Sequence, residues 1–127
     1  MIEGAEEQTV HDAVGGAPFF VALVDRFYDR VEADPVLRRL HPDDLAPARA
    51  HLALFLVQYW GGPTTYSDER GHPRLRMRHA HVPIGSAERD AWYRAMFASV
   101  VEAELPVDLE RRLLDYFTMA ADHLVNA

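Results

Sequence analysis

Residues 58–80 read QYWGGPTTYSDERGHPRLRMRHA, and this stretch separates two regions that both follow a helical pattern. Gly61, Gly62 and Pro63 predict the end of a helix, because glycine and proline are the poorest helix formers. The residues that follow include Tyr66, two histidines and four arginines, so the stretch is not a low-complexity linker. We expect an ordered, irregular segment here, with a short helix over residues 73–80.

On both sides of this segment, apolar residues recur three and four positions apart, which is typical of helices that bury one face. The N-terminal side predicts a helix that ends at Asp34 and a second helix that begins at Pro47. The C-terminal side predicts a helix that begins at Ser86 and another that follows Pro106. No segment alternates every two residues as a strand does. The sequence therefore predicts an all-α fold with four substantial helices.

Length and composition bound the domain organisation and the partners. The chain has 127 residues, of which 49% are hydrophobic, and this suits a single domain. We expect that domain over residues 9–127, after a flexible N-terminal extension over residues 1–8. The formal net charge of −7 argues against a nucleic-acid partner. The absence of cysteine excludes disulfides, thiolate catalysis and cysteine-bound metals.

Two further features concern location in the cell. No apolar run approaches the roughly 18 residues that a membrane span needs, so we expect no membrane span. The first residues, MIEGAEE, lack the basic and apolar blocks of a signal peptide. The sequence therefore predicts a cytoplasmic protein.

His79 is the most informative histidine, because it lies four residues after Leu75 and so shares a helix face with it. The residues alone leave three interpretations open. The commonest is an ordinary structural histidine, and the second is an axial ligand of a haem iron. The third is a zinc site with His72 and His81, although their spacing differs from that of a closed structural site.

A haem at His79 would need an apolar slot and cations beside its carboxylates. Arginine suits carboxylates because its donors form a fork, and the irregular segment carries four arginines. The candidates for the lining of the slot are Leu52, Phe55, Leu75, Met77, Met96 and Phe97.

Six stretches of the chain match the pattern of a known family. The chain resembles the group II truncated haemoglobins of bacteria from His11 to Asn126. The stretches that carry the resemblance are AVGG at 13–16, RFY at 26–28, QYWGGPTTYS at 58–67, GHPRLRMRHA at 71–80, ERDAW at 88–92 and, except at 118 and 122, LLDYFTMAADHLVN at 113–126. The resemblance implies a truncated, two-over-two sandwich of helices that binds haem b.

The resemblance also implies roles for particular residues. His79 would hold the iron from the proximal side, and Tyr28 and Trp92 would donate hydrogen bonds to a ligand on the distal side. Ala48 would stand where larger globins carry a distal histidine, and Leu52 would cover the haem one turn later. Three residues would contact the haem carboxylates, with Arg78 as the first candidate and Tyr66 and Arg74 as the others.

His41 departs from the family pattern, since many members carry tyrosine or phenylalanine at this place. Histidine can donate or accept a hydrogen bond, and it changes charge near neutral pH. We therefore expect His41 to join Tyr28 and Trp92 in a pH-dependent distal network. Ligation of the iron by His41 from the distal side is the alternative.

The function that follows is the reversible binding of dioxygen and other diatomic ligands, NO and CO, at a five-coordinate haem iron. Such a protein would transport or store oxygen. Oxidation of NO to nitrate, or peroxidase-like use of peroxide, would need electrons from an unidentified reductase, so the sequence leaves open whether the chain is an enzyme. A homodimer is a further expectation from the family. The alternative from another class is a haem-free helical sensor or interaction module.

Overall fold

The structure is a computed structural model, and it describes residues 8–74, 79 and 82–126. Within these residues all regular secondary structure is helical, as the sequence predicts. The helices are α1 (Val10–Ala13), α2 (Ala17–Ala33), α3 (Pro35–Arg38), α4 (Ala46–Tyr59), α5 (Thr65–Arg70), α7 (Ser86–Val101) and α8 (Val107–Leu124).

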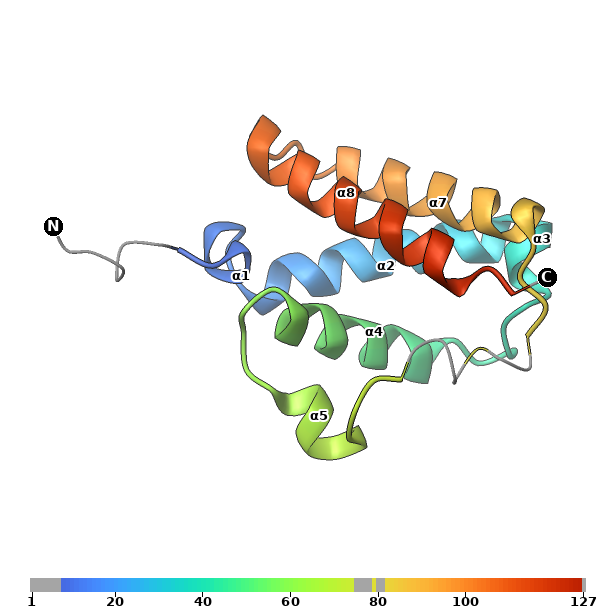
Figure 1. The fold of residues 1–127 in the computed structure, drawn as a ribbon, viewed down its shortest axis with the longest axis horizontal. Helices are drawn as coiled ribbons and strands as arrows, with labels where there is room; N and C mark the ends of the chain where they lie inside the picture. The colour runs from blue at the N-terminus through green and yellow to red at the C-terminus, as the bar shows by residue number, and fades with distance from the viewer. Residues whose placement is uncertain (1–7, 75–78, 80–81, 127) are drawn as a thin grey trace, which may run out of the picture.

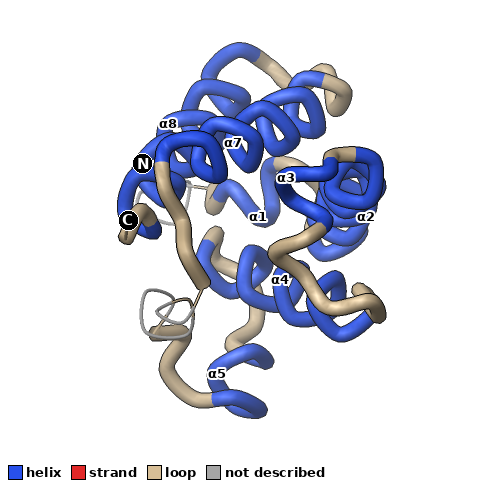
Figure 2. The backbone as a smooth tube through the Cα atoms, turned by 90° about the vertical axis from the view of Figure 1, so that its right-hand side faces the viewer, coloured by secondary structure: helices blue, strands red, loops and turns tan. Residues whose placement is uncertain are grey.

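The four long helices form two pairs, one of α2 with α4 and the other of α7 with α8 (Figure 1). α2 also packs against α7, so it joins the pairs along one side. Both views place α5 on the outer side of α4, away from α7 and α8 (Figure 2). This arrangement leaves α4 and α8 to face each other at the interior, and that is where the site lies.

The longest N-terminal helix, α2, forms where the apolar stripe predicts it. Pro18 occupies its first turn, where the missing backbone donor costs nothing. Phe20, Phe27 and Val31 of its apolar stripe are each at most 1% exposed. The helix ends at Asp34, whose side chain accepts hydrogen bonds from the next backbone N–H groups and so begins α3.

The two glycines after α4 allow a close contact with the start of the chain. The backbone N–H of His11 donates to the carbonyl of Trp60 over 2.9 Å. A Cβ on Gly62 would lie only 2.6 Å from the His11 ring, and Gly61 has a φ of +107°. Any other residue at these positions would push α1 away from the end of α4.

Two boundaries differ from the sequence prediction. α5 is a helix where only an irregular segment was expected, because residues 65–70 make one short turn closed by Gly71. α7 ends at Val101, before the proline that was taken as its limit. The short helix predicted over residues 73–80 falls mostly outside the described residues. None of the helices in the described part of the chain is long and apolar enough to cross a membrane.

Candidate functional site

A cavity of about 380 Å³ lies between the two helix pairs, and its wall is mainly apolar. Its size is within the range of about 300–1,000 Å³ that is usual for small-molecule and cofactor sites. Eight residues that the sequence analysis proposed for the site line this cavity: Tyr28, His41, Ala48, Leu52, Phe55, Tyr66, His79 and Trp92. The structure therefore brings together side chains from α2, α4, α5, α7 and two connecting segments.

His79 lies half-buried at the cavity and is held through its backbone. Its carbonyl accepts hydrogen bonds from the N–H of Val82 at 2.9 Å and from Nδ2 of Asn126 at 3.3 Å. Asn126 also accepts at Oδ1 from the N–H of Ile84 and donates to the carbonyl of Val82. One side chain after α8 thus fixes the segment that carries the imidazole, and sequence reasoning did not single out Asn126.

Tyr28 of α2 brings a phenol to the lining of the same cavity. Burial of the phenol raises the pKa of Tyr28 to about 12, although the nearby charge of Arg49 lowers it in part. The hydroxyl therefore keeps its proton at neutral pH and can donate a hydrogen bond. The ring is held edge-on by Phe27 and by His41, with centroids 5.0 and 5.8 Å away.

The tautomer of His41 follows from its main hydrogen bond. Nδ1 lies 2.8 Å from the carbonyl oxygen of Leu37, which can only accept, so we assign the proton to Nδ1. In the neutral ring Nε2 is then an acceptor. The structure thus adds a hydrogen-bonding direction to the predicted role of His41. The neutral ring cannot donate through Nε2, whereas the protonated ring donates through both nitrogens.

Trp92 projects from α7 and completes the polar part of the lining. Its ring packs against Phe27 of α2 at 5.6 Å and against Phe117 of α8 at 6.0 Å. The indole is therefore held between two helices that belong to different pairs. Its N–H is a donor only.

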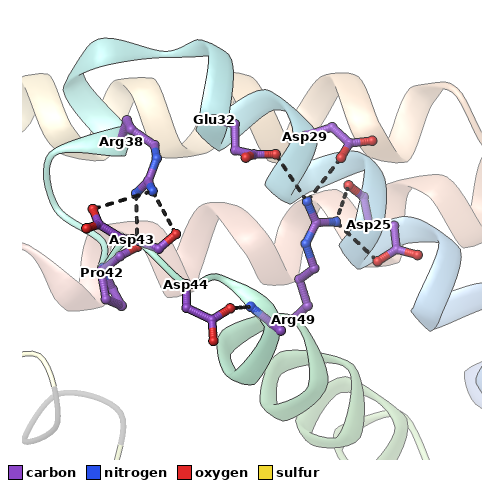
Figure 3. A network of polar contacts seen from close by, with 9 residues as sticks. Asp25, Asp29, Glu32, Arg38, Pro42, Asp43, Asp44 and Arg49 are labelled. Carbon is purple, nitrogen blue, oxygen red and sulfur yellow. Dashed lines mark hydrogen bonds and ion pairs between the residues drawn. The ribbon is translucent and has the colours of Figure 1, made fainter.

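Arg49, which is not among the residues that line the cavity, packs against Tyr28. It reaches from α4 to three carboxylates on α2, at 3.2 Å from Asp25, 3.1 Å from Asp29 and 3.5 Å from Glu32 (Figure 3). Its guanidinium also lies 5.7 Å from the centre of the Tyr28 ring. The same cation thus joins α2 to α4 and covers one face of the phenol.

The segment that carries His41 is fixed in a similar way (Figure 3). Arg38 donates to the backbone carbonyls of Pro42 and Asp43, each over 3.0 Å, and to that of His41 over 3.3 Å. These bonds close the loop between α3 and α4. They keep His41 beside Tyr28.

Two arginines of the described residues line the cavity, Arg70 of α5 and Arg89 of α7. Arg70 is one of the four arginines of the irregular segment, whereas sequence reasoning did not single out Arg89. Arg89 is oriented by Asp122, at 2.8 Å, and its guanidinium lies 5.2 Å from the Tyr93 ring. Arg74, by contrast, is exposed and does not line the cavity, and its backbone N–H donates to Nδ1 of His72.

Two residues predicted to line the haem slot, Met96 and Phe97, do not line the cavity. Met96 is fully buried in the core and is not among the residues of the lining, and Phe97 is 44% exposed on the surface. Leu75, Met77 and Arg78 lie outside the described residues, as does the zinc candidate His81. Among the residues that the structure does describe, no group of three or more metal-binding side chains is found.

The chemistry of the cavity fits a haem. An apolar wall suits the porphyrin, and His79 offers an imidazole that could hold the iron, with the imidazoles of His41 and His51 in the same lining. Arg70 and Arg89 bring positive charge to the lining, which suits the haem carboxylates. Tyr28, His41 and Trp92 add polar atoms that a purely structural core would not need to expose to a cavity.

Comparison with known proteins agrees with this geometry. The sequence profile of the bacterial-like globin family matches residues 9–126. The group 2 truncated hemoglobin YjbI of Bacillus subtilis is 37% identical over 111 residues, which are 87% of this chain and 84% of the relative. The crystal structure of a hemoglobin from the thermophilic phototrophic bacterium Chloroflexus aurantiacus is 52% identical, with a TM-score of 0.93 over 95% of this chain and all of the other. The group II 2-on-2 hemoglobin of Agrobacterium tumefaciens is 34% identical, with a TM-score of 0.91 over 98% of each chain.

The two helix pairs and the cavity between them define a haem globin with a two-over-two arrangement of helices, so the predicted fold class is confirmed. The chain belongs to the bacterial-like globin family and, within it, to the group II truncated haemoglobins. Membership of this family implies that the protein binds haem and small gaseous ligands.

Proposed function

We propose that the protein binds dioxygen reversibly, and NO and CO in its place, at a haem b that His79 holds through its imidazole. The observation that carries the proposal is the position of the Tyr28 hydroxyl and the Trp92 indole in the lining of the same cavity as His79. The haem supplies the iron at which a diatomic ligand binds. Arg70 and Arg89 would contact its carboxylates, and Leu52 and Phe55 would contact its apolar face.

The polar residues would act on the ligand as hydrogen-bond donors. Dioxygen becomes partly negative when it binds a ferrous haem, so a donor that is already in place stabilises it. Tyr28 keeps its proton at neutral pH because its pKa is raised to about 12, and Trp92 has no acceptor to offer. Both residues would therefore favour dioxygen over CO, which carries little charge when bound.

The proposal is tested by optical spectra and by rates of ligand release. We expect the purified protein to bind hemin with a five-coordinate ferrous spectrum, and His79→Ala to lose stable binding, while His72→Ala, on the exposed segment, behaves as wild type. Tyr28→Phe and Trp92→Phe should each raise the oxygen off-rate by about tenfold, since one hydrogen bond contributes about 1–1.5 kcal/mol. Tyr93→Phe, outside the cavity lining, is the control.

Two results would refute the proposal. If the protein does not take up hemin, the haem-free helical module becomes the better explanation. If His79→Ala binds haem as tightly as wild type, another side chain holds the iron.

Oxidation of NO to nitrate is a second candidate that the same donors support. A hydrogen bond to bound dioxygen holds it for reaction with NO, and one electron from a reductase then restores the ferrous state. Consumption of NO by the oxygenated protein, repeated over many cycles only when a reductase and NADH are supplied, would distinguish this enzyme from a carrier.

A further inference from the structure

One face of α4 holds the short helix α5 beside the cavity. His51, Phe55 and Gln58 are four and then three residues apart, so they share this face of α4. Each of them contacts a different residue of α5, and in the same order these residues are Arg70, Tyr66 and Ser67. Tyr66 and Arg70 also line the cavity. The position of α5 on α4 therefore decides how two side chains of the cavity wall are placed.

Gln58 supplies a cap that α5 lacks within its own sequence. The helix has six residues, which are too few for a stable helix in isolation, and Thr64 at its N-cap position makes no side-chain hydrogen bond. Instead, Oε1 of Gln58 accepts from the backbone N–H of Ser67 over 2.9 Å. Ser67 is the third residue of the helix, and its N–H is one that an N-cap side chain would normally bond. A side chain of α4 thus caps α5.

A second bond between the same two side chains makes the cap directional. Nε2 of Gln58 donates to Oγ of Ser67 over 2.7 Å. The amide of Gln58 therefore uses both its acceptor and its donor on one residue of α5. Two hydrogen bonds to one residue restrict its orientation as well as its distance, because hydrogen bonds weaken when they are misaligned.

The other end of α5 is bonded to α4 through His51. Nη1 of Arg70 lies 3.1 Å from Nε2 of His51, and since arginine can only donate, Nε2 is the acceptor. The guanidinium also lies 5.8 Å from the centre of the Tyr66 ring. Arg70 is exposed although it lines the cavity, so burial alone does not fix its position, and these contacts help to fix it.

The two polar contacts lie on either side of an apolar one. Tyr66 is 4% exposed, and its ring stands edge-on to that of Phe55 at 5.6 Å. Apolar packing of this kind has little directional preference. A short helix that is also bonded near its start and at its end can neither slide along α4 nor rotate about its own axis without losing hydrogen bonds.

From this arrangement we propose that Gln58 is a positioning residue, which by capping α5 presents the Tyr66 phenol and the Arg70 guanidinium to the haem carboxylates. His51 has the same role at the other end of the helix. The inference rests on the proposed haem. It adds a residue, Gln58, that is not among those lining the cavity and that acts through α5.

The test uses the haem-loaded protein and two measurements. Transfer of haem to apomyoglobin gives the rate of haem release, and the resonance Raman bending band of the haem carboxylates reports the hydrogen bonds that they accept. We expect Gln58→Leu to release haem about tenfold faster than wild type and to shift the Raman band. Gln58→Glu should behave much as wild type, because it keeps the acceptor for the Ser67 N–H and can also accept from the Ser67 hydroxyl.

A double-mutant comparison separates positioning from a general loss of stability. If Gln58 acts through Tyr66 and Arg70, Gln58→Leu should add little to the haem release rate of a Tyr66→Phe, Arg70→Met variant. If the effects on the rate multiply, Gln58 acts on the fold as a whole and the proposal is wrong. A Gln58→Glu variant that releases haem as fast as Gln58→Leu would also contradict it.

Gln8→Leu is the matched control, because Gln8 is the other glutamine of the chain and is exposed before α1. Ser67→Ala removes one of the two bonds from the side of α5, so it decides the question if Gln58→Leu does not fold. It should release haem faster and shift the Raman band, and a wild-type rate and band would overturn the proposal. If the wild type takes up no hemin, the proposed function itself fails. If the wild type binds haem and Gln58→Leu matches it in both measurements, only the role of Gln58 is wrong.

Discussion

At the scale of single residues, His41 illustrates how one hydrogen bond sets a chemical role. Its Nδ1 donates to the Leu37 carbonyl, so the neutral ring is an acceptor at Nε2 and the protonated ring is a donor. The groups around it are the Tyr28 phenol and the Arg38 guanidinium, which bonds the His41 carbonyl.

We therefore predict that His41 does not slow the release of oxygen as Tyr28 does. In the assigned tautomer Nε2 is an acceptor and cannot donate to bound dioxygen, so His41→Phe should leave the oxygen off-rate unchanged or lower it. Stopped-flow measurement of the off-rate tests the prediction, and a rate in His41→Phe raised as far as in Tyr28→Phe would contradict it.

Asn126 is the second residue with a role beyond its own position. Its side chain bonds the backbone of Val82, Ile84 and His79, and so it holds the proximal segment against the end of α8. We predict that Asn126→Ala releases haem faster than wild type, by about tenfold if one net hydrogen bond is lost. Transfer of haem to an excess of apomyoglobin measures the rate. His123→Ala, exposed in the last turn of α8, should release haem at the wild-type rate.

At the scale of elements, the α2–α4 pair depends on apolar packing and on one cation. Arg49 bonds carboxylates on three successive turns of α2, and all three carboxylates are more than half exposed. Each exposed ion pair contributes little by itself, but the three share one ordered arginine. Its cost in side-chain entropy is therefore incurred only once.

We predict that Arg49→Met lowers the free energy of unfolding by about 1 kcal/mol and that most of this loss disappears at high salt. Arg94→Met, at an exposed position of α7, is the control and should change little. Because Arg49 also covers the Tyr28 ring, the variant should in addition raise the oxygen off-rate. Equal unfolding midpoints for wild type and Arg49→Met in urea would contradict the proposed brace.

At the scale of the whole molecule, two buried phenols make the free energy of unfolding depend on pH in the alkaline range. The pKa of Tyr28 rises from 10.0 to about 12 on burial, and that of Tyr116 rises for the same reason. Between these values the unfolded chain loses protons that the native protein keeps, so the stability falls as the pH rises. The contribution is fully present below pH 10.0 and is lost by about pH 12.

We predict that the free energy of unfolding falls between about pH 10 and 12 and that Tyr28→Phe reduces the slope. Urea unfolding at several pH values in this range measures the slope, with Tyr93→Phe as the control. A slope in Tyr28→Phe as steep as in wild type would mean that Tyr28 ionises equally easily in the native and unfolded states.

The sequence by itself determined the helices and pointed to eight of the residues that line the cavity. The apolar spacing of α2 and α8, and the stop at Gly61 and Gly62, are local properties, because a helix depends on residues three and four apart. The quoted motifs then singled out His79, Tyr28 and Trp92 as candidate site residues through a resemblance to relatives. Neither kind of information required knowledge of how the helices lie against one another.

Only the tertiary structure decided which residues meet across the chain. Arg89 lines the cavity and Arg74 does not, and Asn126 contacts His79, because packing sets how each helix is rotated and where its ends lie. The contact of Tyr59 with Tyr116 has the same origin, since the two rings come from helices far apart in the sequence. Helical periodicity places a residue on one face of its own helix, and it does not say which residue of another helix that face will touch.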